Sequence, residues 1–215
     1  MRLIDFSQKR SIMTHYLKEL RDINIQHDRL RFRLNLKRIS QLLGYELSKF
    51  LDYENKEVQT PLGKKQVQTA QDQIVISSIL RAGLPMHEGL LETFDKADNA
   101  FISAYRIEEE EQIRVKVEYE SSPDLNGKTL LLADPMIATG RSMMNCLEEL
   151  KKFGNPKRIF LLGIVASQLG INVLNDHLDD DVECYIADID PDLNDKSYIV
   201  PGLGDAGDMA FGTKL

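Results

Sequence analysis

The stretch Leu130-Leu-Leu-Ala-Asp-Pro-Met-Ile-Ala-Thr-Gly-Arg-Ser142 joins an apolar run to an acid and then to a turn of small residues. The run Leu130–Ala133 is short and apolar throughout, which predicts a buried strand that Asp134 and Pro135 bring to an end. Apolar residues then recur at helical spacing, which predicts a helix from Arg141 onward. Together with the alternating strands and helices expected from Gln73 onward, this joint indicates an α/β protein with a parallel sheet.

The turn itself predicts an anion site. It delivers Ala138 to Ser142 to the first turn of the helix, where backbone N–H groups are unpaired and the helix dipole favours negative charge. Thr139 adds a hydroxyl donor, and Gly140 lets the backbone approach a ligand closely. The stretch lacks the Lys of a G-x-x-x-x-G-K-[ST] loop, which excludes a nucleoside triphosphatase of that kind. An ordinary strand–turn–helix joint is the alternative interpretation.

A second candidate segment is Ile79-Leu-Arg-Ala-Gly-Leu84, which follows the apolar run Ile74-Val-Ile76 after two serines. Its Arg81 carries a guanidinium group, a rigid fork of donors that suits phosphate oxygens. An arginine that closes an ordinary surface loop is the alternative.

The third segment is the glycine-rich string Tyr198-Ile-Val-Pro-Gly-Leu-Gly-Asp-Ala-Gly-Asp208. Gly202, Gly204 and Gly207 spell G-x-G-x-x-G, but a dinucleotide-binding fingerprint must open a βαβ unit, and no such unit follows here. A disordered polar tail is the alternative.

Together, these three segments resemble the type I phosphoribosyltransferases. The form Asp134-Pro-Met-Ile-Ala-Thr-Gly140 and the C-terminal string are similar to those of the uracil phosphoribosyltransferases. In most relatives that act on purines or orotate, two adjacent acids stand at the positions of Asp134 and Pro135. The resemblance implies an α/β fold with a type I phosphoribosyltransferase-like parallel sheet flanked by helices. N-terminal helices, a β-arm and a C-terminal hood loop complete that fold.

The resemblance also implies an activity: transfer of the phosphoribosyl group of 5-phosphoribosyl-1-diphosphate (PRPP) to uracil, giving uridine 5′-monophosphate (UMP) and diphosphate. Main-chain amides of a glycine-rich loop can match the donors and acceptors along the edge of uracil. Mg²⁺ is expected to arrive bound to PRPP rather than on metal ligands of the chain. The residues implied are, for catalysis, Arg81, Arg106 and Asp134; for PRPP, these three with Pro135, Met136, Ile137, Ala138, Thr139, Gly140, Arg141, Ser142 and Asp205; and for uracil, Ile199, Gly204, Asp205 and Ala206.

Several positions depart from the family pattern. Arg141 stands where a small residue is usual, Ala166-Ser-Gln-Leu-Gly170 replaces a different common string, and Ile107–Tyr119 lacks the proline typical of the β-arm, which takes part in dimer contacts. These departures leave a second function open, a catalytically weakened paralogue that acts as a PRPP- or UMP-responsive regulator or interaction module. Some type I members hold a non-proline cis peptide in the diphosphate loop, for which Arg81–Ala82 is the candidate bond here.

Length and composition set further limits. A chain of 215 residues suits a single domain, 1–215, with an N-terminal helical segment at 1–50 and a base-binding hood at 190–215. The net charge of −7 argues against a nucleic acid partner. No apolar run approaches the ~18 residues of a membrane span, and the start of the chain lacks the apolar region of a signal peptide, so a cytoplasmic protein is expected. The family resemblance predicts a homodimer or a higher homo-oligomer.

The remaining predictions concern the two cysteines and the other helices and strands. Cys146 and Cys184 lie in apolar stretches without metal-ligand spacing, which predicts buried, unreactive thiols. The segment Asp52–Gln68 is predicted to be irregular, with at most a short strand. The expected helices are Ser11–Asp22, Asp28–Lys49, Met86–Phe94 and Ile171–His177, and the expected strands are Ile74–Leu80, Ala100–Arg106, an exposed antiparallel Ile113–Tyr119, Ile159–Val165 and Val182–Ala187.

Overall fold

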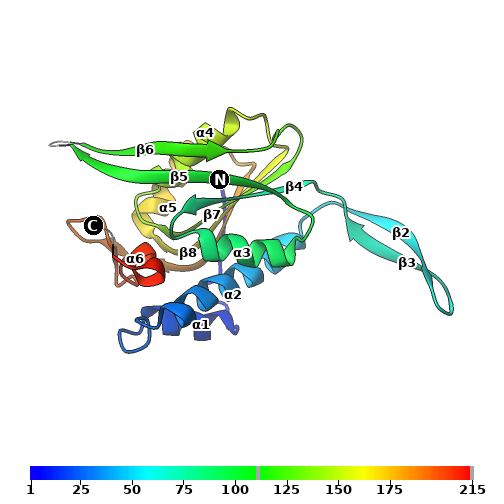
Figure 1. Ribbon diagram of the computed structural model, residues 1–215, viewed down its shortest axis with the longest axis horizontal. Helices are drawn as coiled ribbons and strands as arrows, with labels where there is room; N and C mark the ends of the chain where they lie inside the picture. Colours follow the sequence, from blue (N-terminus) through cyan, green and yellow to red (C-terminus); the bar gives the residue numbers. More distant parts are fainter. Residues whose placement is uncertain (110–111, 214–215) are drawn as a thin grey trace.

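The computed structural model describes residues 1–109 and 112–213, and of residues 104–109 and 112–118 it describes the backbone only. Within these residues, a seven-stranded sheet has the strand order β1-β9-β8-β7-β4-β5-β6 (Figure 1). Neighbouring strands run parallel, except that β5 and β6 are antiparallel. The strands are β1 (Arg2–Asp5), β4 (Ile74–Leu80), β5 (Asp98–Glu109), β6 (Gln112–Ser121), β7 (Thr129–Ile137), β8 (Arg158–Ser167) and β9 (Val182–Asp190).

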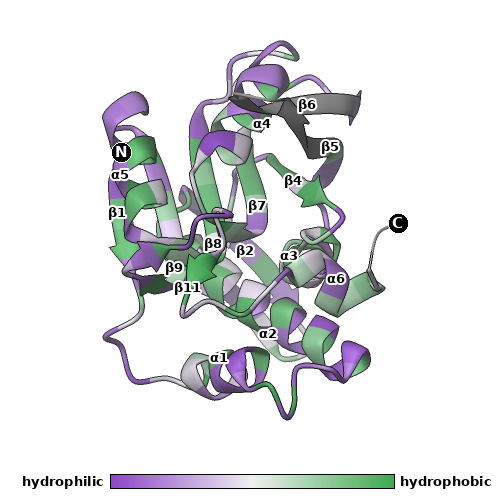
Figure 2. Cartoon of the chain, turned by 90° about the vertical axis from the view of Figure 1, so that its left-hand side faces the viewer, coloured by the Kyte–Doolittle hydropathy of each residue, from purple (hydrophilic) through white to green (hydrophobic). Residues whose placement is uncertain are grey.

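Helices cover both faces of this sheet (Figure 1). One face carries α1 (Met13–Arg21), α2 (Arg29–Ser48) and α3 (Leu84–Thr93), and the other carries α4 (Arg141–Lys151) and α5 (Gln168–His177). The alternation of side chains along β7 explains the two layers, because Leu131 packs into the apolar cluster on the first face while Leu130 and Leu132 pack into the cluster on the second. Figure 2 shows the hydrophobic colour concentrated on the central strands. The sheet flanked by helices confirms the predicted fold class.

Strand β7 is longer than predicted. It continues through Asp134 and Pro135 to Ile137, where the sequence had indicated an end at the acid. Strand β4 pairs with β7 only as far as Ala133, and beyond that point β7 pairs with β8 alone. Pro135 therefore lies where one side of the strand needs no backbone donor, the position in which a sheet tolerates proline.

The segment predicted to be irregular is a regular hairpin. Strands β2 (Tyr53–Thr60) and β3 (Gly63–Ala70) pair along their whole length and project from the body as a two-stranded ribbon (Figure 1). Nearly all of its side chains are exposed on both faces, so the sequence carries no apolar alternation to reveal it. Strand β1 was also not anticipated. It adds to the sheet edge parallel to β9.

Strand β4 has the expected bounds, and the other expected elements are present with shifted ends. Strand β6 forms an antiparallel edge strand as predicted. The C-terminal part contains the short strands β10 (Asp192–Leu193) and β11 (Ile199–Val200) and the helix α6 (Ala206–Phe211). Both cysteines are buried, and burial raises the pKa of each thiol to about 12, in agreement with the prediction. Across the described part of the chain, no helix combines the length and the apolar character needed to cross a bilayer.

Candidate active site

The phosphate loop, residues 138–142, connects the carboxyl end of β7 to α4. Gly140 is the N-cap of α4 and has φ +74°, a left-handed conformation that favours glycine. No side chain caps this helix, so its first N–H groups stay available to a ligand. A pocket opens directly on these groups, lined by Asp134, Met136, Ile137, Ala138, Thr139, Gly140, Ser142 and Met143. The structure therefore brings most of the residues predicted to bind phosphate around one pocket; Pro135, which is buried, and Arg141, which is exposed, do not line it.

The phosphate loop is held from behind by the segment that departs from the family pattern. The hydroxyl of Ser167, at the end of β8, donates to the carbonyl of Ala138 at 2.5 Å and accepts from the N–H of Gly170 at 2.8 Å. A Cβ atom on Gly170 would lie 2.5 Å from the oxygen of Ala138, so only glycine allows this approach. Ser167 thus caps α5 and orients the first peptide group of the phosphate loop at the same time.

Arg81 directly follows β4 and turns toward the C-terminal segment. Its Nη2 atom lies 3.1 Å from Oδ1 of Asp208, and its Nη1 atom donates to the carbonyl of Gly212 at 3.3 Å. The Nε atom is buried and has no hydrogen-bond partner among the described residues. The cis peptide bond of this loop is Leu80–Arg81, so the expectation of a cis Arg81–Ala82 bond is wrong by one position.

The described part of the hood, residues 190–213, folds back onto the body. Ile199 and Ala206 are buried in the same apolar cluster as Ala138 of the phosphate loop. Gly204, with φ +84°, is exposed between them. Asp205 is the N-cap of α6, and its Oδ1 atom accepts from the N–H of Asp208 at 2.9 Å. The four residues predicted to bind uracil therefore lie in one short ordered segment that contacts Arg81 through Asp208.

The other two residues predicted to be catalytic are Asp134, on β7, and Arg106, on β5. Asp134 is half-buried on the wall of the phosphate pocket, and its Oδ1 atom accepts from the N–H of Met136 at 3.2 Å. Arg106 lies on β5, opposite Val115 of β6, and its side chain falls outside what the structure describes.

Comparison with known proteins identifies this arrangement. A family model described as uracil phosphoribosyltransferase matches residues 7–213. The chain belongs to the uracil phosphoribosyltransferase family. The uracil phosphoribosyltransferase of Porphyromonas gingivalis is 44% identical over 216 residues that cover all of both chains. That of Thermococcus gammatolerans is 40% identical over 202 residues, covering 93% of this chain and 88% of its own.

Solved structures share the fold of this chain. The AQ2163 protein from Aquifex aeolicus superposes with a TM-score of 0.88 at 31% identity and covers 99% of each chain. A hypoxanthine phosphoribosyltransferase from Staphylococcus aureus has a TM-score of 0.52 at 14% identity, over 86% of this chain and 84% of its own, which supports the fold alone.

Three residues of this uracil phosphoribosyltransferase family member contact the phosphate loop or the hood but were not predicted from the sequence. Ser167 supports the phosphate loop, while Arg21 and Asp190 bind the backbone of the hood. Only Ser167 left a signal in the sequence, because it lies three residues before Gly170, a spacing that suits an N-cap. Arg21 and Asp190 lie far apart along the chain and belong to no local pattern.

Proposed function

We propose that this protein transfers the phosphoribosyl group of PRPP to uracil. In this reaction N1 of uracil bonds to the anomeric carbon, the bond from that carbon to diphosphate breaks, and the N1 proton is released. The observation that carries the proposal is the contact of Arg81 with the hood, because it joins the cation predicted to bind diphosphate to the glycine-rich segment predicted to bind uracil. Membership of the family supports the same reaction.

The phosphate loop would bind the 5′-phosphate of PRPP. Its free N–H groups, the hydroxyls of Thr139 and Ser142 and the dipole of α4 all favour an anion at this point. The 5′-phosphate takes no part in the bond changes. Its binding energy therefore serves to position the sugar for reaction, with Asp134 placed to accept from a ribose hydroxyl.

Arg81 and Arg106 would stabilise the negative charge that grows on the leaving diphosphate. The buried Nε donor of Arg81 supports this role, since leaving such a donor unpaired costs roughly 1–3 kcal/mol that a phosphate oxygen would recover. No general base is required, because the leaving group departs early and the uracil N1–H is acidic once the new bond forms.

Mg²⁺ fits as a companion of PRPP. Among the residues whose side chains the structure describes, 1–103 and 119–213, no three acidic, histidine or cysteine side chains converge as a metal cage. Mg²⁺ usually keeps several waters and binds substrate phosphates, so an ion that arrives bound to PRPP needs no such cage on the chain. When bound, the ion supplies positive charge against the diphosphate. Uracil itself would lie against Ile199, Gly204, Asp205 and Ala206.

The decisive experiment incubates the purified protein with Mg²⁺, PRPP and one nucleobase at a time, and separates the products by chromatography. UMP from uracil, with no mononucleotide from cytosine, adenine or hypoxanthine, is the expected result. A different mononucleotide would reassign the substrate, and none at all would favour a PRPP- or UMP-responsive regulator. We further propose a cytoplasmic homodimer or higher homo-oligomer, whose mass light scattering would measure.

A further inference from the structure

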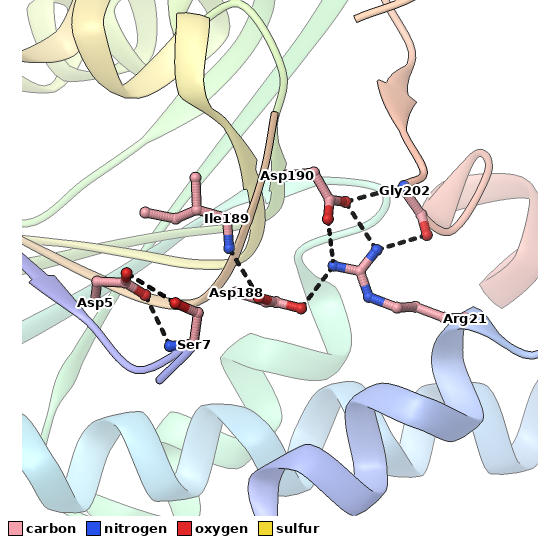
Figure 3. Close-up of polar contacts among 7 residues, drawn as sticks. All are labelled: Asp5, Ser7, Arg21, Asp188, Ile189, Asp190 and Gly202. Carbon is pink, nitrogen blue, oxygen red and sulfur yellow. Dashed lines mark hydrogen bonds and ion pairs between the residues drawn. The ribbon is translucent and has the colours of Figure 1, made fainter. Parts of the chain in front are cut away.

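Both polar backbone groups of Gly202, in the middle of the hood, are held by charged side chains (Figure 3). Its carbonyl accepts from Nη1 of Arg21 at 2.8 Å, and its N–H donates to Oδ2 of Asp190 at 2.9 Å. Arg21 and Asp190 also bind each other through two hydrogen bonds of 2.8 and 3.0 Å. The three residues thus form a closed ring of charge-assisted hydrogen bonds, which are shorter and stronger than neutral ones.

The ring joins three parts of the fold. Arg21 is the last residue of α1, Asp190 ends β9, and Gly202 follows the cis Val200–Pro201 bond. Gly202 has φ +61°, and a Cβ atom there would lie 2.0 Å from the carbonyl oxygen of Ile199. The backbone is therefore bent sharply at this residue and admits no side chain.

The surroundings make this contact rigid. Asp190 is 6% exposed and Gly202 is buried, so water competes little for these hydrogen bonds. Asp188 binds the remaining side of Arg21 at 2.8 Å without touching Gly202. Gln26, between α1 and α2, adds a further contact: its Nε2 atom donates to the carbonyl of the next hood residue, Leu203, at 3.3 Å.

We propose that Arg21 and Asp190 are positioning residues for uracil, an inference that rests on the proposed function. Gly202 lies between Ile199 and Gly204, the residues that would contact the base. Recognition by backbone groups depends on peptide planes held in fixed directions, because such groups have no side chain with which to adjust. By fixing both polar groups of Gly202, the last residue of α1 and the last residue of β9 together set the direction of the loop that reads the base.

Kinetics of two variants test this inference. Arg21→Gln keeps a side chain of similar length but loses the charged guanidinium group, and Asp190→Asn keeps a side-chain oxygen that can accept from the N–H of Gly202. Because each removes hydrogen bonds to a charged group, KM for uracil should rise about ten- to a hundredfold in Arg21→Gln and less in Asp190→Asn. KM for PRPP and kcat at saturating uracil should change by less than about threefold. Asp188→Asn is the matched control, since it weakens a contact of Arg21 that does not reach the hood.

Hydrogen exchange gives a readout that does not depend on catalysis. Amides of residues 199–206 should exchange faster in Arg21→Gln than in Asp188→Asn, with the phosphate loop unchanged in both. If the wild type is active and Arg21→Gln keeps its KM for uracil, or loses affinity for PRPP and uracil equally, the positioning role is wrong while the proposed function stands. Unaltered exchange at the hood also overturns it. A wild type that forms no UMP overturns the proposed function first, and the role in base binding with it.

Discussion

Replacing Ser167 by Ala should destabilise the protein and weaken PRPP binding together. Ser167 is fully buried, and its hydroxyl satisfies two backbone groups that no solvent reaches. Loss of an N-cap hydroxyl costs about 1 kcal/mol, and an unsatisfied buried carbonyl, here that of Ala138, costs about 1–3 kcal/mol more. The expected loss in the free energy of unfolding is therefore about 2–4 kcal/mol.

Urea and thermal unfolding would measure this loss. For a chain of this length, each kcal/mol lowers Tm by about 2–4 °C, so a decrease of roughly 5–15 °C is expected. The matched control is Ser40→Ala. Ser40 is equally buried, but its hydroxyl donates only to the carbonyl of Lys37 in its own helix, at 2.7 Å. That carbonyl is already a helix acceptor, so the control should lose less than about 1.5 kcal/mol.

The same variant separates support of the phosphate loop from simple stability. At a temperature where Ser167→Ala is fully folded, KM for PRPP should rise while KM for uracil stays near the wild-type value. A supporting role for Ser167 is contradicted if Ser167→Ala unfolds no more easily than Ser40→Ala, or if its KM values for PRPP and uracil are both unchanged.

Four further outcomes are expected. Arg81→Ala should lower the rate of UMP formation roughly 10²- to 10³-fold with little change in Tm, because it removes a charged donor from the leaving group; near-normal turnover would remove Arg81 from the site. Asp205→Ala should weaken uracil binding more than PRPP binding, and Asp205→Asn, which keeps an oxygen to cap α6, should lose less uracil affinity. Equal uracil affinity of the wild type and both variants in calorimetry would contradict this. A hydrogen bond from Arg31 lowers the pKa of Glu19 to about 2 from its usual 4.5, so this carboxylate stabilises the fold above pH 4.5 and loses that effect as the pH falls toward 2. The free energy of unfolding of Glu19→Gln should therefore depend less on pH across that interval, and the same pH dependence as in the wild type would refute the assignment. Both cysteine thiols should resist a thiol reagent at pH 8 in the native protein and react in urea, and rapid native labelling would contradict their burial.

The sequence was most informative where one local pattern determines both the element and its chemistry. The phosphate loop belongs to this class, because an apolar strand, a glycine and a periodic helix follow one another within residues 129–151. Such a loop stands at the carboxyl end of its strand whatever the rest of the chain does. The end of β7 could not be located in the same way, since Pro135 is tolerated only because β4 stops pairing at Ala133.

Other features depend on partners that are distant along the chain. Strand β1 has four residues without a decisive pattern, and it is a strand because β9 offers it an edge. The β2–β3 ribbon is exposed on both sides, so its side chains leave no periodic signal. The pairing of Arg21 with Asp190 and Gly202 is a tertiary event, and neither composition nor spacing distinguishes Arg21 from the other arginines of the N-terminal helices.

The distance along the chain between Arg21 and Gly202, 181 residues, has a consequence for biosynthesis. The N-terminal residues leave the ribosome first, and the contact between Arg21 and Gly202 must wait until residue 202 has also emerged. The strands and turns that would cradle a phosphate are all made before residue 170. Under the proposed function, the phosphate loop can therefore form during synthesis before the segment that would read the base.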